Sequence, residues 1–171
     1  MLTSFFAAGE CRIMKIGVEI NQLSEEFLRE YPASQYPELM CKQGRPYSCL
    51  LLDLDLDFGY IICIPYRSSI RHKNAFLFTG TERSRRTQSG LDYSKMVLVQ
   101  KKSYLNGQNV VVDQDEYNET IRNIQRIAGE AVAYIEGYVS HVSGTKPLHP
   151  RAYERKYRFS TLPYFKDVLG L

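Results

Sequence analysis

The sequence contains no tryptophan and none of the short motifs that mark the commonest enzyme sites. It has no GxSxG nucleophile elbow, no HExxH zinc motif, no Walker phosphate loop and no GxGxxG dinucleotide loop. No apolar run reaches the roughly 18 residues that a membrane helix requires. Residues 1–9 lack the basic start of a signal peptide. We therefore expect a cytoplasmic protein with no membrane partner.

Cysteine is scarce and scattered. The four residues, Cys11, Cys41, Cys49 and Cys63, form no CxxC pair, and two of them sit inside apolar runs where cysteine behaves as a small buried hydrophobe. We expect reduced thiols. Because no Cys/His pair has the spacing of zinc ligands, the sequence predicts no metal centre and no cofactor.

An acidic stretch, residues 53–57, offers the one pattern that invites a metal. Asp53, Asp55 and Asp57 alternate with leucine, and spaced carboxylates can bind Mg²⁺ or Ca²⁺. The glycine and the terminal glutamate of an EF-hand loop are missing. The alternation also suits a strand with leucine inward and aspartate outward, which is the interpretation we favour.

A chain of 171 residues with 44% hydrophobic residues has the size and apolar content of one domain. We expect a compact α+β domain over residues 14–171, preceded by a loose N-terminal extension over residues 1–13. Alternating and apolar runs predict strands at residues 14–20, 48–53, 60–65, 95–99 and 110–113. Helical spacing predicts helices at residues 24–30, 151–159 and, as one long helix, about 115–139. Residues 73–90 have loop composition.

Charge is distributed unevenly along the chain, although the net charge is only +3. Residues 61–102 hold nine basic and two acidic residues, and residues 141–171 hold six basic and two acidic ones. Two basic segments that share a face would attract a polyanion. The residues expected to contact RNA in this way are Lys73, Arg83, Arg85, Arg86, Lys101, Lys102, Arg151, Arg155, Lys156 and Arg158. Charge that only solubilises the fold is the alternative.

The candidate site follows the strand at residues 60–65. The chain there runs into a polar, basic segment, residues 66–72, and nearby basic residues extend it. The candidate catalytic residues are Lys42, Arg45, Arg67, Ser68, Ser69, Arg71 and His72, with Lys95 close by. Cations and hydroxyls suit RNA cleavage, since RNA carries its own 2′-OH nucleophile and needs charge stabilisation and proton transfer but no metal. Histidine titrates near neutral pH and can serve as acid or base.

Less specific interpretations stay open for the same residues. His72 would also be an ordinary surface histidine, and Ser68 and Ser69 would also cap a turn. The arginines at 83, 85 and 86 fit a phosphate-contacting flap and a solvated loop equally well. A basic groove that binds RNA without cutting it explains the composition as well as a ribonuclease does.

Four segments resemble a known family. Tyr36-Pro-Glu-Leu, Lys42-Gln-Gly-Arg-Pro-Tyr47, Ile64-Pro-Tyr-Arg-Ser-Ser-Ile-Arg-His72 and Ser89-Gly-Leu-Asp-Tyr-Ser-Lys95 are similar, in order and spacing, to the ToxN/AbiQ-like endoribonuclease toxins of type III toxin–antitoxin systems, closest to the CptN/TenpN branch. The resemblance implies a twisted antiparallel sheet with a barrel-like core, as in Kid/MazF-type toxins. It also implies metal-independent cleavage to 2′,3′-cyclic phosphate and 5′-OH ends. Inhibition and processing of a repeated pseudoknot RNA, in a closed protein–RNA assembly, are implied as well.

The family motif has a Thr-Ser pair followed by Lys. The matching stretch here is Arg67-Ser68-Ser69, so that one of the serines takes the hydroxyl role and Arg71 the cationic one. Lys42 or Arg45 would stand for an upstream basic residue, and Asp92, Tyr93 and Lys95 would support the site or touch RNA. A toxin inhibited by a protein rather than by RNA is a further alternative. Cellular RNA is the expected substrate, and no DNA partner is expected.

Overall fold

The structure is a computed structural model, and it describes residues 16–40, 48–54, 59–107 and 110–171. The expected N-terminal extension, Cys11, Cys41, Lys42, Arg45, Asp55 and Asp57 lie outside the described residues. Asp53 is exposed between buried leucines, as expected for a strand that turns its aspartates outward. Cys49 and Cys63 are buried free thiols, as expected.

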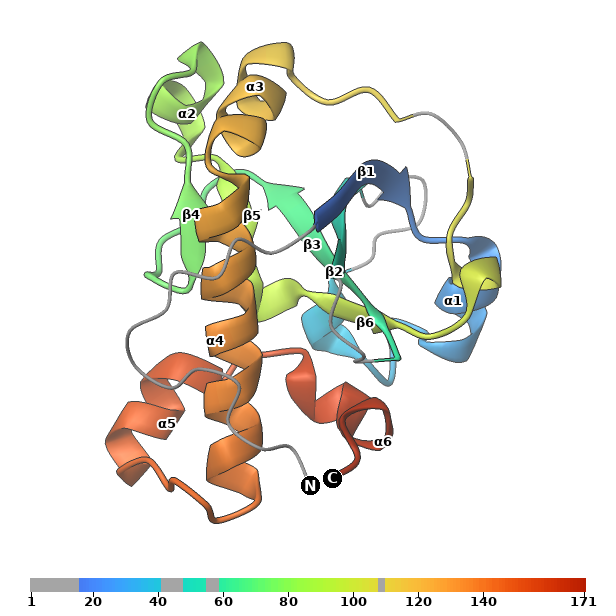
Figure 1. Ribbon diagram of the computed structural model, residues 1–171, viewed down its shortest axis with the longest axis vertical. Coiled ribbons are helices and arrows are strands. Elements are labelled where there is room, and N and C mark those ends of the chain that lie inside the picture. The colour runs from blue at the N-terminus through green and yellow to red at the C-terminus, as the bar shows by residue number, and fades with distance from the viewer. Residues whose placement is uncertain (1–15, 41–47, 55–58, 108–109) are drawn as a thin grey trace.

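The domain is α+β, as predicted, and is built on a six-stranded antiparallel sheet (Figure 1). The strands run in the spatial order β1-β2-β3-β5-β4, and β6 also pairs with β3. Within the described residues this sheet is not closed into the barrel that the resemblance implied. The strands are β1 (Ile16–Gln22), β2 (Ser48–Leu54), β3 (Ile61–Arg67), β4 (Ala75–Leu77), β5 (Gly90–Asp92) and β6 (Val97–Val99).

Strand β3 changes its neighbour halfway along its length. Its first half pairs with β6, ending at Cys63 opposite Val97, and its last two residues pair with β5, beginning at Tyr66 opposite Leu91. Pro65 lies in the gap between the two pairings, where a residue without a backbone N–H is tolerated. The 3₁₀ turn η2 (Tyr93–Lys95), which joins β5 to β6, therefore lies beside the middle of β3.

The predicted long helix is two helices. α3 (Gln114–Arg122) and α4 (Ile124–Val142) are separated at Asn123, so the expectation of one helix over 115–139 is wrong. The Asn123 side chain donates a hydrogen bond of 2.8 Å to the backbone carbonyl of Glu119 and so competes with continued helical hydrogen bonding. α4 runs across the sheet in Figure 1 and buries Ile127, Ala131 and Ile135 in the core.

The shorter helices agree in part with the sequence. α1 (Glu25–Glu30) starts at Ser24, whose hydroxyl accepts the Phe27 N–H at 3.3 Å as an N-cap. α5 (Pro150–Tyr157) is the predicted basic helix. The remaining short helical segments are η1 (Pro37–Leu39), η3 (Lys102–Tyr104), η4 (Leu162–Phe165) and α6 (Lys166–Leu169). No helix in the described part of the chain is long and apolar enough to cross a membrane.

Two local predictions are wrong. Residues 110–113 form no strand, although their apolar run suggested one. Residues 73–90, expected to be a loop, contain β4 and the helix α2 (Glu82–Thr87). Thr81 starts α2 with a capping box, in which Ser84 N–H donates to the Thr81 hydroxyl at 2.9 Å and Thr81 N–H to the Ser84 hydroxyl at 3.2 Å.

Candidate active site

Asp92 lies at the centre of the candidate site and binds the residues around it. Its carboxylate is fully buried at the end of β5, and its Oδ2 atom accepts a hydrogen bond from the Arg67 guanidinium and lies 3.3 Å from Nε2 of His72. The Oδ1 atom accepts the backbone N–H and the hydroxyl of Ser94 at 2.9 and 2.6 Å. Both carboxylate oxygens are thus occupied, and Arg67 and His72 share Oδ2.

The register of the sheet explains why these residues meet. Arg67 lies opposite Gly90 on β5, two residues before Asp92 on the same strand. A Cβ atom on Gly90 would come within 2.3 Å of the Phe76 carbonyl oxygen on β4, so only glycine permits this approach of the strands. The side chains of Arg67 and His72 remain 24% and 38% exposed, and both are open to a ligand.

The electrostatics of Asp92 follow from its partners. Burial raises the pKa of this carboxyl, but hydrogen bonds from His72 and Ser94 and the charges of His72 and Arg67 outweigh burial and hold the pKa below its ordinary value. Asp92 is therefore a charged anchor at neutral pH. It fixes the guanidinium and the imidazole side by side at the protein surface.

The loop of residues 68–74 joins β3 to β4 in the chain. It is hydrogen-bonded to the end of α2 on one side and to α5 on the other. At one end, the Ser69 and Ile70 N–H groups donate to the carbonyls of Thr87 and Gln88, at 2.5 and 3.2 Å. At the other end, the Asn74 side chain donates to the Lys156 carbonyl at 3.0 Å. α2, this loop and α5 form what we call the basic edge, which lies on the left-hand side of Figure 1.

Ser69 has a strained backbone. Its φ angle is +58°, in the left-handed region that favours glycine. Ser68 and Ser69 are both exposed, as are Arg71 and Lys73 in the same loop. Among the described residues, Met40 and Gln88 share this conformation as C-caps of η1 and α2, whereas Ser69 adopts it in the polar loop of the candidate site.

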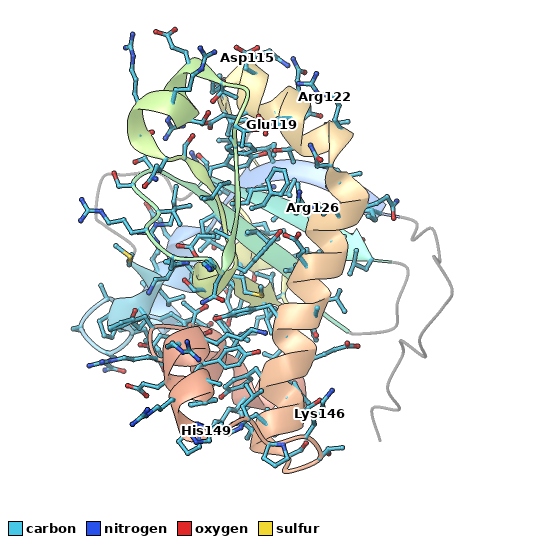
Figure 2. The ribbon with its side chains drawn as sticks, turned by 90° about the vertical axis from the view of Figure 1, so that its left-hand side faces the viewer. Asp115, Glu119, Arg122, Arg126, Lys146 and His149 are labelled. Carbon is cyan, nitrogen blue, oxygen red and sulfur yellow. The ribbon has the colours of Figure 1, made fainter. Side chains whose placement is uncertain are left out.

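Two glutamates of α3 fix α2. The Glu116 carboxylate is fully buried and accepts hydrogen bonds from Ser89 and, at 3.1 Å, from Arg83. Glu119 accepts the N–H groups of Thr79 and Gly80 at 3.0 and 3.1 Å. In Figure 2, Glu119 points from α3 towards the α2 segment. The predicted arginine flap is therefore an anchored helix.

The arginines of α2 differ in their partners. Arg83 is paired with Glu116, and Arg86 with Glu82 on the same helix. Arg85 is exposed, and its Nε donates to the Thr81 carbonyl at 3.3 Å. Arg85 thus has no carboxylate partner among the contacts of the described residues and is the best placed of the three for a phosphate.

α5 contributes the second basic group of the edge. Lys156 is half-buried, and its ammonium lies 5.7 and 5.4 Å from the ring centres of Tyr134 and Tyr157. Burial lowers the pKa of this lysine. Burial raises the pKa of Tyr134, against the lowering effect of a hydrogen bond with Ser160, and the Tyr134 hydroxyl donates to the Lys156 carbonyl at 3.0 Å. Arg151, Arg155 and Arg158 are exposed on or just after the same helix.

Several predicted RNA-contacting residues lie elsewhere or serve the fold. Lys95 is buried and binds Glu38 and, at 2.7 Å, the Phe159 carbonyl. The Tyr93 hydroxyl donates to Glu130 at 2.8 Å. Lys101 pairs with Glu30 of α1 at 3.2 Å. Lys102 begins η3, which packs beside α1, across the molecule from the basic edge (Figure 1).

Sequence reasoning assigned no role to Asn74, Ser94, Tyr134 or Phe159. Asn74 and Ser94 hold the loop and Asp92 in place, and nothing in the local sequence distinguishes them from ordinary turn residues. Among the described residues, no group of three or more histidine, cysteine, aspartate or glutamate side chains is placed to hold a metal ion. A shallow depression on α3, lined by Tyr117, Asn118, Ile121 and Arg122, contains none of the candidate residues.

Comparisons with protein-family models, with curated proteins and with solved structures found no match to this chain.

Proposed function

We propose that this protein is an endoribonuclease that cleaves RNA without a metal ion. The observation that carries the proposal is the pairing of Arg67 and His72 on the buried carboxylate of Asp92. This arrangement presents a fixed cation and an oriented proton-transfer group at a basic, solvent-accessible surface. Those are the two functions that RNA transphosphorylation requires from a protein.

The reaction uses the substrate's own nucleophile. The 2′-oxygen forms a bond to the adjacent phosphorus, the bond from phosphorus to the 5′-oxygen breaks, and the products carry a 2′,3′-cyclic phosphate and a 5′-OH. A proton leaves the 2′-OH and another reaches the departing 5′-oxygen. His72 transfers protons at the nitrogen that faces away from Asp92, and the carboxylate keeps the ring in one orientation.

The surrounding groups bind the phosphate. Arg67 and Arg71 stabilise the negative charge that develops on the equatorial oxygens, and Ser68 and Ser69 donate hydrogen bonds that orient the phosphate. Lys73, Arg85 and the basic residues of α5 extend the electrostatic surface along the RNA backbone. Lys42 and Arg45, outside the described residues, remain candidates for further phosphate contacts.

The biological role we infer is that of a type III toxin in the cytoplasm. The basic edge would hold repeats of a pseudoknot antitoxin RNA as bound cleavage products in a closed protein–RNA assembly, so that one surface serves catalysis and inhibition. The order and spacing of the four sequence segments support this role. The same proposal includes a sheet core related to those of ToxN and Kid/MazF-type toxins. Cellular RNA is the substrate of the released toxin.

A non-catalytic RNA-binding module is the second candidate. It is favoured by the compensation of the Arg67 charge by Asp92, which leaves less positive charge for a phosphorane. RNA cleavage by the wild type separates the two candidates, and variants then test which residues are responsible for it. His72→Ala should abolish cleavage and toxicity while retaining RNA binding, whereas Lys101→Ala, far from the basic edge, should change neither. Cleavage and toxicity unaffected by His72→Ala would contradict the catalytic assignment.

The molecule that copurifies with the protein separates an RNA antitoxin from a protein antitoxin. The ratio of nucleic-acid to protein absorbance is a sensitive readout here, because the chain has no tryptophan. We expect bound RNA that nuclease treatment removes. A copurifying protein without RNA would instead favour a protein-inhibited toxin.

A further inference from the structure

Phe159 is an exposed aromatic ring at the end of the basic edge that α5 forms. It follows the C-terminal end of α5 and is 58% exposed, although phenylalanine is among the residues most often buried. The guanidinium of Arg158 lies 5.0 Å from the centre of the ring and is held at 3.4 Å by Glu154. The ring is thus presented to solvent with a cation on one side.

The backbone beneath this ring is firmly anchored. The Lys95 ammonium, whose side chain is only 7% exposed, donates to the Phe159 carbonyl at 2.7 Å and also binds Glu38. Thr161 N–H donates to the Ser94 carbonyl at 3.0 Å. Burying an ammonium is costly unless it is paired and hydrogen-bonded. Here the buried ammonium holds the backbone of a residue whose side chain is exposed.

The turn η2, which contains Lys95, also follows Asp92 directly in the chain. Asp92, which holds Arg67 and His72, is immediately followed by η2, whose members Ser94 and Lys95 bind the segment that carries Phe159. The backbone of the segment that carries Phe159 is therefore held by the same short turn that follows Asp92.

We propose that Phe159 is a stacking platform for an unpaired nucleobase that flanks the cleaved phosphate. This inference rests on the proposed endoribonuclease function and adds that the substrate is single-stranded at the cut. Aromatic rings beside basic residues are the usual means of binding single-stranded nucleic acid, and Arg151, Arg155 and Lys156 supply the basic surroundings. An apolar protein partner would have to desolvate these charges.

A double-mutant cycle tests the stacking directly. The probe is a short single-stranded RNA spanning a mapped cut site, prepared intact and with one abasic nucleotide at each position in turn. Phe159→Ala should weaken binding of intact RNA by about tenfold. The wild type should lose a similar factor with one abasic RNA, and the variant should lose nothing further with that RNA, because both changes remove the same contact.

Phe159→Trp provides an independent readout, since it introduces the only tryptophan of the chain. Intact RNA should quench its fluorescence, and the abasic RNA identified above should not. The matched control is Leu28→Trp on α1, also at an exposed apolar position, where RNA should leave the fluorescence unchanged. Phe159→Trp should keep wild-type affinity. Together with the weaker binding of Phe159→Ala, this result would show that an aromatic ring is needed at the position.

The outcomes separate this inference from the function on which it rests. If the wild type cuts RNA and Phe159→Ala binds and cuts it equally well, the platform is refuted and the ribonuclease function stands. The same conclusion holds if the affinity lost in Phe159→Ala adds to the affinity lost with every abasic RNA. If stripped wild type neither binds nor cuts RNA, both are refuted. Fluorescence of the Phe159→Trp variant that responds only to a copurifying protein would assign the ring to a protein interface.

Discussion

Nε2 of His72 lies 3.3 Å from Oδ2 of Asp92, so the carboxylate at the end of β5 orients the imidazole of the loop of residues 68–74. The Arg67 guanidinium binds the same oxygen. A buried carboxylate that orients a histidine is a common arrangement in proton-transfer sites, and it gives Asp92 a positioning role rather than a direct one.

Replacing Asp92 by asparagine should reduce RNA cleavage by at least about 100-fold, because the imidazole loses the charge that orients it. Loss of the buried anchor should also lower the free energy of unfolding by about 1–3 kcal/mol, with Arg67 still partly solvated. Single-turnover cleavage and denaturant unfolding measure the two effects. Ser94→Ala, which removes only one hydrogen bond to Oδ1, is the control and should cost about 1 kcal/mol of stability. Unchanged cleavage by Asp92→Asn would contradict the role of the carboxylate.

Asp92 should also make stability depend on acid. Its pKa is lowered in the folded protein, so its contribution is present above the unfolded-state pKa of about 3.9 and is lost as pH falls through the lower folded value. The difference in unfolding free energy between the wild type and Asp92→Asn should therefore be constant near neutral pH and shrink below about pH 4. A difference that stays constant down to the acid transition would show that the carboxylate is not stabilised in its charged form.

Ser69 allows its backbone and its hydroxyl to be tested separately. Because its φ angle is +58°, Ser69→Gly should be more stable than Ser69→Ala by about 1 kcal/mol. Both variants lack the hydroxyl, so both should cleave RNA more slowly than the wild type if the hydroxyl orients the phosphate. Full activity of Ser69→Gly would show that only the backbone conformation matters. Ser68→Ala, one residue away and equally exposed, tests which of the two serines contributes.

Glu116 should control the stability of α2 locally. Glu116→Gln weakens the buried contacts to Ser89 and Arg83, and we expect a loss of about 1–3 kcal/mol in unfolding free energy. Amide hydrogen exchange should speed up mainly in residues 79–89, which the α3 carboxylates hold. The matched control is Glu82→Gln, which breaks the exposed pair with Arg86 and should change stability by less than about 0.5 kcal/mol. Equal effects of the two variants would argue against the anchoring role.

Salt dependence should map the RNA-binding surface. Each lysine or arginine that contacts a phosphate steepens the fall of affinity with salt, so Arg71→Ala should reduce the slope by about one counterion. Lys101→Ala should leave the slope unchanged, because Lys101 lies beside α1 and pairs with Glu30. Equal changes in slope for both variants would mean that RNA does not follow the basic edge.

The sequence predicted the elements with a clear period or cap. The apolar runs of β2 and β3, the Ser24 cap of α1 and the basic helix α5 were correct. β4 and β5 have three residues each, too few to show alternation. Thr81 begins α2 with serine rather than glutamate at the third helical position, so its capping box was inconspicuous. Asn123 interrupts an apolar pattern that continues on both sides of it.

The location of the candidate site was accessible from sequence, but its organisation was not. The hydroxyls and cations of residues 67–72 are contiguous in the chain. Their common anchor, Asp92, depends on the register that places Arg67 opposite Gly90, which no local pattern specifies. Lys95 was predicted to touch RNA, yet tertiary packing buries its ammonium against Glu38 and the Phe159 carbonyl. Charge composition alone cannot distinguish such a structural lysine from a surface one.

The most direct test is to incubate the protein, stripped of bound nucleic acid, with a long RNA in excess EDTA and to determine the chemistry of the new ends. We expect cleavage that yields 2′,3′-cyclic phosphate and 5′-OH ends and that disappears with His72→Ala. Tight RNA binding without cleavage would contradict the catalytic claim and leave a binding module. Cleavage that requires added Mg²⁺ would contradict the metal-independent mechanism and direct attention to the acidic residues that begin at Asp53.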